Sequence, residues 1–345
     1  MKAPAVSMTE PLRVVCMGGG TGLSSLLDGL KKYVRPVAEH PGAEEHPGLD
    51  ITAVVAVSDD GGSSGRLRRE FDVLPPGDIR NCMVALSEDG ALLSRLFQYR
   101  FESGHGLKGH SFGNLFLTAM TTVTGDFPEA VRKSCEVLNI AGRIFPATAS
   151  KVALEAVLEG GRVVSGETRI SRSKRRIREI RMVPGDARPL KETLDAIARA
   201  DLITLGPGSL FTSVIPNLLV KGIPQAIRKS GALKAYFVNL MSQPGETIDF
   251  QASDHVAAIR THAGFALLDW AVVSTTRVSP ALRRKYAEQN ASPVENDNAG
   301  LHDLGLEILE ADLLQKGPKV RHNPAAIGAV ALELARRGRA RKQTA

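Results

Sequence analysis

RVVCMGGGTG, residues 13–22, is the stretch of sequence that decides the fold. Residues 13–17 form a short apolar run that ends abruptly in glycines, which is typical of a buried parallel strand. Beyond the glycines, leucines at helical spacing would share one face of a helix: Leu23, Leu26, Leu27 and Leu30. The stretch therefore predicts a strand, a tight glycine loop and a helix, in that order.

The same order of elements returns twice along the chain. Residues 51–57 (ITAVVAV) predict a buried strand followed by the polar loop DDGGSSG at 59–65. Residues 201–205 predict a strand, GPGS at 206–209 a loop, and a helix begins at Leu210. Further strands are predicted at 235–240, 270–274 and 308–311, and further helices at 79–86, 92–99, 114–123, 128–138, 190–200, 248–263 and 324–337. This alternation indicates an α/β fold with a Rossmann-like, doubly wound and mostly parallel sheet.

One segment departs from the alternation. Residues 152–158 and 163–170 flank Glu159-Gly160-Gly161 and predict a β-hairpin, with a third strand at 177–183. We therefore expect a disordered lead at 1–11, a single α/β nucleotide-binding domain at 12–335 and a basic, frayed tail at 336–345. The hairpin insertion, about 151–183, belongs to this domain.

Composition excludes several classes of protein. With 345 residues and 43% hydrophobic residues, the chain can bury a core without metals or disulfides. The three cysteines form no CxxC pair, so no disulfide framework or zinc knuckle is indicated. No apolar run approaches the roughly 20 residues that span a bilayer, and residues 1–10 lack the pattern of a signal peptide. We expect a cytoplasmic protein without a transmembrane segment.

The net charge of +7 comes largely from two basic clusters, at residues 172–181 and 336–342. Aromatic residues make up 5% of the chain and do not interleave with either cluster, so no nucleic-acid surface is predicted. We expect both clusters to be solvated surface. The alternative is that the tail contacts an acidic partner or a membrane surface.

The three glycine loops carry the main chemical signal. Loops at the carboxyl ends of parallel strands meet at one edge of the sheet, where ligands bind. Glycine lets the backbone approach a ligand closely, and the N–H groups of the next helix attract anions. The first loop lacks the dinucleotide fingerprint G-x-G-x-x-G, because Leu23 stands where the last glycine is required. No Lys-Ser/Thr pair follows the glycines as in a P-loop. The loops predict phosphate binding and disfavour a nicotinamide oxidoreductase.

Adjacent acids at the end of the second strand allow two interpretations. Asp59 and Asp60 could hold a hard cation such as Mg²⁺ or accept hydrogen bonds from sugar hydroxyls. They could equally form a turn or a helix cap. Asp78 follows Pro75-Pro76-Gly77 where an N-cap is expected, and Asn81 lies one turn beyond on the same helix end.

Polar residues near two further helix starts complete the candidates. His110 and Asn114 could face the cleft, with Ser111 as a cap, although a structural histidine is equally compatible. Thr212 and Ser213 could contact phosphate through their hydroxyls. No catalytic triad can be assigned, because spacing does not place its members.

Together these segments resemble one known family, in order and spacing, from about residue 13 to residue 324. The matching strings are VVCMGGGTGLSSLLDGL, AVSDDGGSSGRLRREFDVLPPGDIRNCMVAL, GHSFGNLFLTAM, PATASKVALEAVLEGG and LGPGSLFTSVIPNLLVKGI. They resemble the phospholactate-transferase-like family, and LRRKYA at 282–287 and VRHN at 320–323 resemble its gluconeogenesis-factor branch. The connector at 36–49 and the basic tail match no part of it.

The resemblance implies a UDP-sugar-binding regulatory protein, with UDP-N-acetylglucosamine as ligand, needed for cell shape and cell-wall homeostasis on gluconeogenic carbon sources. It implies that Tyr286 and Arg321 contact the ligand, and we also expect a protein partner in cell-wall control and a homo-oligomer. The alternative is a Mg²⁺-dependent phospholactate-transferase-type enzyme using Asp59 or Asp60. The candidate ligand-binding residues are Gly18, Gly19, Gly20, Thr21, Gly22, Asp59, Asp60, Ser63, Ser64, Asp78, Asn81, His110, Asn114, Gly206, Gly208, Ser209, Thr212, Tyr286 and Arg321.

Overall fold

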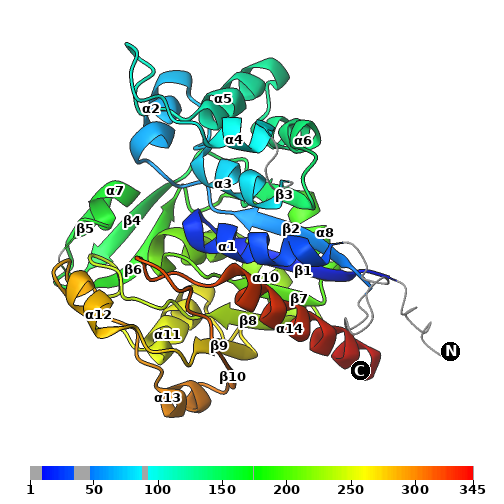
Figure 1. Ribbon diagram of the computed structural model, residues 1–345, viewed down its shortest axis with the longest axis vertical. Coiled ribbons are helices and arrows are strands. Elements are labelled where there is room, and N and C mark those ends of the chain that lie inside the picture. The colour runs from blue at the N-terminus through cyan, green and yellow to red at the C-terminus, as the bar shows by residue number, and fades with distance from the viewer. Residues whose placement is uncertain (1–9, 35–46, 88–91, 174, 345) are drawn as a thin grey trace.

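The computed structural model describes residues 10–34, 47–87, 92–173 and 175–344 (Figure 1). The lead at 1–9 and most of the connector at 36–49 lie outside these residues. A seven-stranded sheet forms the centre of the molecule, in the order β10-β9-β8-β7-β1-β2-β3, and every neighbouring pair is parallel. The strands are β1 Leu12–Gly18, β2 Leu49–Val55, β3 Arg143–Pro146, β7 Leu202–Leu205, β8 Leu233–Phe237, β9 Trp270–Ser274 and β10 Glu307–Ala311.

The strand order confirms the predicted doubly wound sheet. From β1 the chain builds outward through β2 to β3, returns to the other side of β1 as β7, and continues to β10. Consecutive strands therefore diverge between β1 and β7, and this switch point opens a crevice at their carboxyl ends. The first and third glycine loops follow these two strands. The sequence analysis missed β3, because RIFP is too short to give a periodic signal.

Helices cover both faces of the sheet. Helices α1 and α14 lie side by side on the face toward the viewer in Figure 1, next to α3. Helices α8 to α11 pack on one another, and α13 packs on α11. The helices of the sheet region are α1 Gly20–Leu30, α8 Lys191–Arg199, α9 Ile215–Leu219, α10 Ile223–Lys229, α11 Ala252–Ala263, α12 Pro280–Ala287, α13 Asn298–Asp303 and α14 Pro324–Thr344, with a 3₁₀ turn at Lys31–Tyr33 and a π-helical turn at Leu210–Val214.

Between β2 and β3 the chain forms a helical lobe, at the top of Figure 1. Its helices are α2 Gly62–Phe71, α3 Gly77–Leu86, α4 Leu92–Gln98, α5 Phe112–Thr124 and α6 Phe127–Leu138. Ser111 accepts a hydrogen bond from the backbone N–H of Asn114 and so caps α5, as the sequence suggested. Helix α6 is capped in the same way by Asp126.

The predicted insertion is a separate antiparallel sheet, ordered β5-β4-β6. Its strands are β4 Ala153–Leu158, β5 Val163–Ser165 and β6 Ile177–Val183. The second strand was predicted to continue to residue 170. Instead Gly166, at a φ of 96°, turns the chain into the short helix α7 (Glu167–Ile170), whose Thr168 N–H donates to Asp60 in the loop after β2.

The prediction of a frayed C-terminal tail is wrong. Helix α14 continues to Thr344, and its basic side chains bond to the amino-terminal end of the sheet. Arg339 donates to the buried Asp201 carboxylate over 3.0 and 2.7 Å, and Lys342 lies 3.3 Å from the same group. The basic cluster at 336–342 therefore stabilises the fold instead of remaining free for a partner.

Among the described residues, no single helix has both the length and the apolar composition to cross a membrane. One pair of short helices, Leu210–Leu219 and Ile223–Lys229, reaches that composition only when joined, and it is bent by 78°.

Candidate functional site

The first and third glycine loops meet at the switch point. A Cβ atom on Gly22 would lie 2.3 Å from the carbonyl oxygen of Pro207, and one on Gly208 would lie 3.3 Å from the carbonyl oxygen of Gly19. Only glycine permits this approach of two backbones. Gly18 and Gly206, at the strand ends, pack against each other behind the loops. The two loops therefore form one surface.

This surface borders a cavity of about 330 Å³. Helix α1 begins at Gly20, so the backbone N–H groups of its first turn lie at this cavity, and that of Gly20 is bonded to Asp78. Of the predicted residues, seven line it: Gly19, Gly20, Thr21, Gly22, Gly208, Ser209 and Arg321. The hydroxyls of Ser25 and Ser213 also border it. The cavity has the size of a small-ligand site and the donors that an anionic group requires.

The loop after β8 forms a third wall, which the sequence analysis missed. Residues 235–240 were predicted as strand, but β8 ends at Phe237 and leaves Asn239, Leu240 and Met241 in a loop. The Asn239 side chain accepts from the N–H of Gly208 and donates to its carbonyl oxygen. Gln243 donates to the hydroxyl of Ser209 over 2.7 Å. The third wall thereby fixes the GPGS loop.

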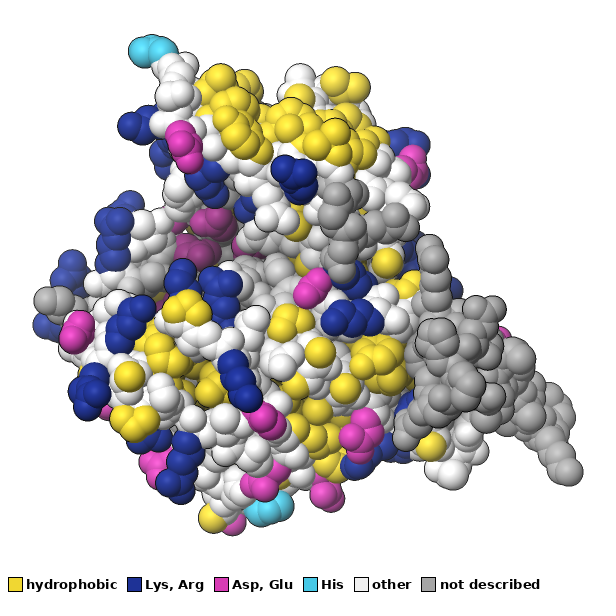
Figure 2. Space-filling model, in the orientation of Figure 1, with side chains coloured by type: hydrophobic (Ala, Val, Ile, Leu, Met, Phe, Trp, Pro, Cys, Tyr) yellow, Lys and Arg dark blue, Asp and Glu magenta, His cyan; other side chains and the backbone are white. Residues whose placement is uncertain are grey.

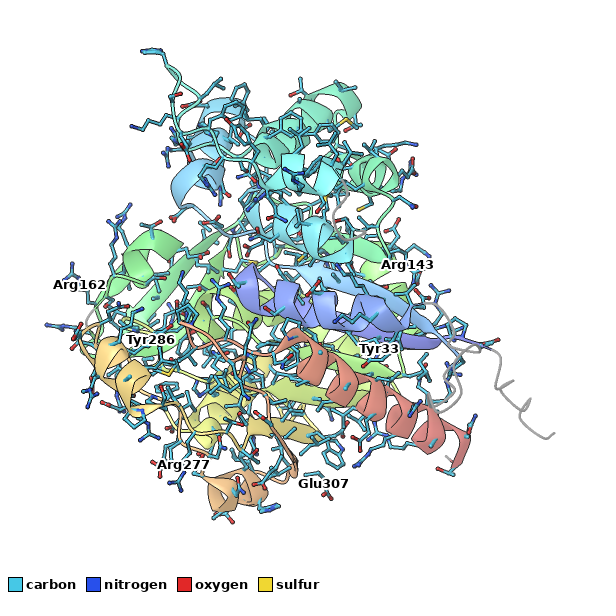
Figure 3. All side chains as sticks on the ribbon, in the orientation of Figure 1. Tyr33, Arg143, Arg162, Arg277, Tyr286 and Glu307 are labelled. Carbon is cyan, nitrogen blue, oxygen red and sulfur yellow. The ribbon has the colours of Figure 1, made fainter. Side chains whose placement is uncertain are left out.

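Arg321 and Tyr286 have different places in the site. Arg321 is exposed and lines the cavity, whereas Tyr286 lies on α12, where Figure 3 labels it. The Tyr286 hydroxyl accepts a hydrogen bond of 3.1 Å from the backbone N–H of Val320, the residue before Arg321. Tyr286 therefore positions the segment that carries the arginine, a connection across 34 residues that no local pattern could reveal.

His322 was also missed. Its Nε2 atom lies 3.2 Å from the carbonyl oxygen of Val238, so this nitrogen carries the proton and Nδ1 is an acceptor. Burial lowers the pKa of His322 to about 4. The ring is therefore neutral at pH 7 and contributes no positive charge to the cavity.

Carboxyl groups gather beside the loops, and Figure 2 shows acidic side chains at the bottom of a hollow below the helical lobe. Asp78 accepts a hydrogen bond from the N–H of Gly20 in the first loop. Burial, followed by repulsion from Asp59, raises the pKa of Asp78 to about 6. Burial and the same neighbouring carboxylates raise the pKa of Glu167, on α7, to about 9. Asp59, Asp78 and Glu167 thus form an acidic floor that adjoins the glycine loops.

The two adjacent acids, Asp59 and Asp60, bond to different parts of the molecule. Asp59 accepts from the N–H of Gly61 over 2.8 Å, and burial raises its pKa. Ser64 donates to the same carboxylate. Asp60 turns to the insertion and accepts from both the backbone N–H and the hydroxyl of Thr168, so it caps α7. The turn interpretation thus describes Asp59, which is also the neighbour of Asp78, whereas the bond from Asp60 to the start of α7 was not predicted.

Two further expectations need correction. Asp78 is not an N-cap, because α3 begins at Gly77 and the Asp78 carboxylate reaches the first loop instead. Thr212 does not face the cavity; its hydroxyl donates to the buried Glu246 carboxylate over 3.2 Å. Asn81 is half-buried and accepts from the Arg80 guanidinium.

Ser63, His110 and Asn114 form a buried cluster away from the cavity. The Ser63 hydroxyl lies 2.9 Å from Nδ1 of His110 and accepts from the Asn114 amide over 3.1 Å. Burial and the nearby Arg66 lower the pKa of His110. The cluster joins the start of α2 to the start of α5, so the helical lobe is tied together at the end that faces the acidic floor.

Comparison with known proteins agrees with this geometry. The family model of 2-phospho-L-lactate transferase CofD matches residues 14–314, from the first strand to the segment before Arg321. The chain belongs to the CofD family. Within it, the gluconeogenesis factor of Halalkalibacterium halodurans is 46% identical over 321 residues, covering 93% of this chain and 95% of the relative. That of Bacillus subtilis is 44% identical over 328 residues, with coverage of 95% and 99%.

A crystal structure of a protein from Bacillus halodurans has the same fold. Its TM-score is 0.88 at 44% identity, and the match covers 94% of this chain and 100% of that one. The resemblance seen in the sequence is thereby confirmed over nearly the whole chain.

Within this CofD-family site, no group of three His, Cys, Asp or Glu side chains in the described parts of the chain is arranged to hold a metal ion. Mg²⁺ in phosphate sites is commonly held by one or two carboxylates together with ligand phosphates and water. Asp59 and Asp78 fit that role beside the loops, and Asp60 is already bonded to Thr168.

The raised pKa of Asp78 leads to a prediction about stability. A carboxyl whose folded pKa exceeds its ordinary value of 3.8 stabilises the fold below pH 4, and this stabilisation is lost as pH rises to about 6. Asp78→Asn should therefore be more stable than wild type by about 1–3 kcal/mol above pH 6. Denaturant unfolding at pH 7.5 and pH 4 measures this. An equal difference in stability between Asp78→Asn and wild type at both pH values would contradict the raised pKa of Asp78.

Proposed function

We propose that this protein is a UDP-sugar-binding regulatory protein, a gluconeogenesis factor that acts in the cytoplasm on cell shape and cell-wall homeostasis. The observation that carries the proposal is the cavity where the two glycine loops, the start of α1 and Arg321 converge. The names of the relatives, gluconeogenesis factors at 46% and 44% identity, support the physiological part. UDP-N-acetylglucosamine is the ligand that we propose.

The ligand's diphosphate would lie against the N–H groups of the glycine loops and the start of α1. The Arg321 guanidinium would pair with phosphate oxygens in a bidentate arrangement. The sugar hydroxyls would donate to carboxylates of the acidic floor, where Asp78 adjoins Gly20. A regulatory protein of this kind needs no chemical step, because ligand occupancy would be the signal to a protein partner.

A second function, phosphoryl-group transfer of the phospholactate-transferase type, is favoured by one observation. Burial, followed by repulsion from Asp59, raises the pKa of Asp78 beside the glycine loops, and a cation bound between the two carboxylates would relieve the repulsion. Mg²⁺ bound there would neutralise the diphosphate and stabilise charge developing on it. In that case Asp59 and Asp78 would hold the ion, and the loops would orient the phosphates.

Arg321→Ala tests the proposed site. We expect the dissociation constant for UDP-N-acetylglucosamine to rise at least about tenfold, about 1.4 kcal/mol of binding free energy, since a charge-assisted phosphate contact is lost. Isothermal titration calorimetry on the purified chain measures it. Lys319→Ala is the matched control: Lys319 is an exposed cation two residues away that does not line the cavity.

Two results would overturn the assignment. Unchanged affinity in Arg321→Ala would show that Arg321 does not contact the ligand. Equal losses in Arg321→Ala and Lys319→Ala would indicate general electrostatic attraction instead of a built site. Product formation from a nucleoside-diphosphate-linked donor, abolished by a chelator, would favour the transferase.

A further inference from the structure

The insertion at residues 151–183 carries most of the net charge of the chain. It contains nine basic and four acidic residues, which gives this segment a formal net charge of +5, against +7 for the whole chain. The basic cluster at 336–342 is bonded to Asp201 and belongs to the fold. The charge of the insertion is not used in this way, and like charges held close together repel one another unless an anion neutralises them.

All the arginines of the insertion are exposed. Arg181 pairs with Glu179 over 2.8 Å, and Arg176 lies 3.9 Å from Asp249. Four others make no ion pair and no side-chain hydrogen bond with another described residue: Arg162, Arg169, Arg172 and Arg178. Their guanidinium groups therefore keep all their donors for solvent or an external anion. We call the exposed arginines of the insertion the arginine surface: Arg162, Arg169, Arg172, Arg175, Arg176, Arg178 and Arg181.

A β-bulge adds one of these arginines to the outside of the sheet. In the register of β4 and β6, Leu158 lies opposite the buried Ile177. The neighbouring Val157 lies opposite Glu179, so Arg178 has no partner residue on β4. A bulge of this kind bends the strand and changes the direction of a side chain. The strand thereby presents to solvent an arginine that the pairing of the sheet does not require.

The outer face of the insertion sheet also carries apolar side chains. Leu154 and Ala156 of β4 are completely buried on the inner face. Val163 and Val183 lie opposite the alternate residues of β4, so they belong to the outer face, where they are 53% and 46% exposed. Arg181 belongs to the same face. Small apolar side chains can enter the interfacial region of a bilayer while long basic side chains reach its phosphates.

The arginine surface projects from the molecule. In Figure 2, Lys and Arg side chains stand along the outline at the end where Figure 1 places α7 and β5. Arg162, which Figure 3 labels, lies at the outer edge of this end. A projecting surface suits a flat partner. Residues 151–183 contain no aromatic side chain that could stack on a base, so a nucleic acid is a poorer complement than a layer of lipid headgroups.

We propose that the arginine surface docks the protein onto a lipid bilayer with anionic headgroups. Headgroup phosphates would accept hydrogen bonds from the guanidinium groups, and each arginine near the surface adds to the attraction by a negatively charged leaflet. Helix α7 of the same insertion bonds to Asp60 beside the acidic floor, so docking would hold the glycine-loop cavity close to the bilayer. None of these arginines is assigned to the ligand, and the proposal does not rest on the proposed function.

Flotation of the full chain with lipid vesicles tests the proposal. We expect wild type to bind vesicles of phosphatidylcholine and phosphatidylglycerol in similar amounts at low ionic strength, and not to bind phosphatidylcholine alone. High salt should release the protein, because it screens the attraction. Arg172→Glu/Arg178→Glu should lower the partition coefficient at least about tenfold, since each change replaces attraction by repulsion. Arg162→Glu/Arg169→Glu should do the same from other parts of the arginine surface.

Lys221→Glu/Lys229→Glu is the matched control. It changes the net charge by the same amount at two exposed lysines, one just before α10 and one at its end, outside the insertion. This variant should bind the anionic vesicles nearly as well as wild type. All the substituted side chains are exposed, so every variant should keep the circular dichroism spectrum of wild type.

Three results would overturn the proposal. Wild type that does not bind anionic vesicles would leave the arginine surface to an acidic protein. Equal losses in the arginine and lysine variants would show attraction by net charge alone, and equally strong binding to phosphatidylcholine would assign the contact to apolar side chains. The titrations with UDP-N-acetylglucosamine concern other residues, so failure of the proposed function and failure of this proposal are distinguishable.

Discussion

Asp201→Ala is expected to lower the free energy of unfolding by about 3–5 kcal/mol, because it removes a buried carboxylate that the half-buried Arg339 and Lys342 share. The carboxylate is 2% exposed and accepts from the N–H of Arg13, from two nitrogens of Arg339 and from Lys342. It thereby joins the start of β1, the start of β7 and the C-terminal helix. Urea unfolding followed by circular dichroism measures the effect.

The stabilisation by Asp201 should also depend on pH. Burial acts to raise the pKa of Asp201, but the hydrogen bonds from Arg339 and Arg13 outweigh it and lower the pKa. The stabilisation is therefore present above the ordinary value of 3.8 and is lost as pH falls through the lower folded pKa. Lys191→Ala, which removes an exposed pair with Asp195, should leave the urea midpoint almost unchanged. A loss for Asp201→Ala as small as this would show that α14 is not held by the ion pair.

Gly22→Ala should weaken UDP-N-acetylglucosamine binding at least about a hundredfold and destabilise the fold by about 1–3 kcal/mol. The added Cβ would lie 2.3 Å from the Pro207 carbonyl oxygen and 2.8 Å from the backbone nitrogen of Gly208. Both are backbone atoms, so the two loops must separate. Calorimetric titration and thermal unfolding of the same preparation report both effects.

Gly20→Ala is the matched control in the same loop. A Cβ there meets nothing within 4 Å, but φ is +62°, so the cost is about 1 kcal/mol of backbone strain without displacement of the GPGS loop. If Gly22→Ala bound the ligand as well as Gly20→Ala, close contact of the loops would not be required for the site.

The glycine loops could be predicted from sequence because their signal is local. An apolar run that stops at consecutive glycines and resumes as a leucine-faced helix defines strand, loop and helix within 20 residues. The parallel sheet then brings the loop after β1 beside the one after β7. At the other end of the same two strands, Arg13 and Asp201 bond to each other although 188 residues separate them in sequence. The fold class and the surface formed by the first and third glycine loops followed from these rules.

Side-chain partners distant in sequence could not be predicted. Asp60 and Asp59 are equivalent in sequence, and only the arrival of Thr168, 108 residues later, assigns Asp60 to a cap. The role of Tyr286 depends on the N–H of Val320. The basic run at 336–342 has the composition of a solvated tail, and it became a helix terminus because Asp201 lies where Arg339 can reach it.

The acidic floor places a condition on any ligand of the glycine loops. Asp59 and Asp78 raise the negative potential beside the proposed phosphate site, whereas Glu167, with a pKa of about 9, is neutral at pH 7. A nucleotide sugar would meet this floor with sugar hydroxyls, whereas a reacting diphosphate would require a cation between it and the acids. The dependence of binding on Mg²⁺ therefore separates the two proposed functions.

The most direct measurement is calorimetric titration of the wild-type chain with UDP-N-acetylglucosamine and with GDP, each with Mg²⁺ and with a chelator. The proposed function predicts that UDP-N-acetylglucosamine binds at least about tenfold more tightly than GDP and that the chelator leaves this preference intact. Tighter binding of GDP that disappears with the chelator would contradict it and would establish the cation-dependent transferase site at Asp59 and Asp78.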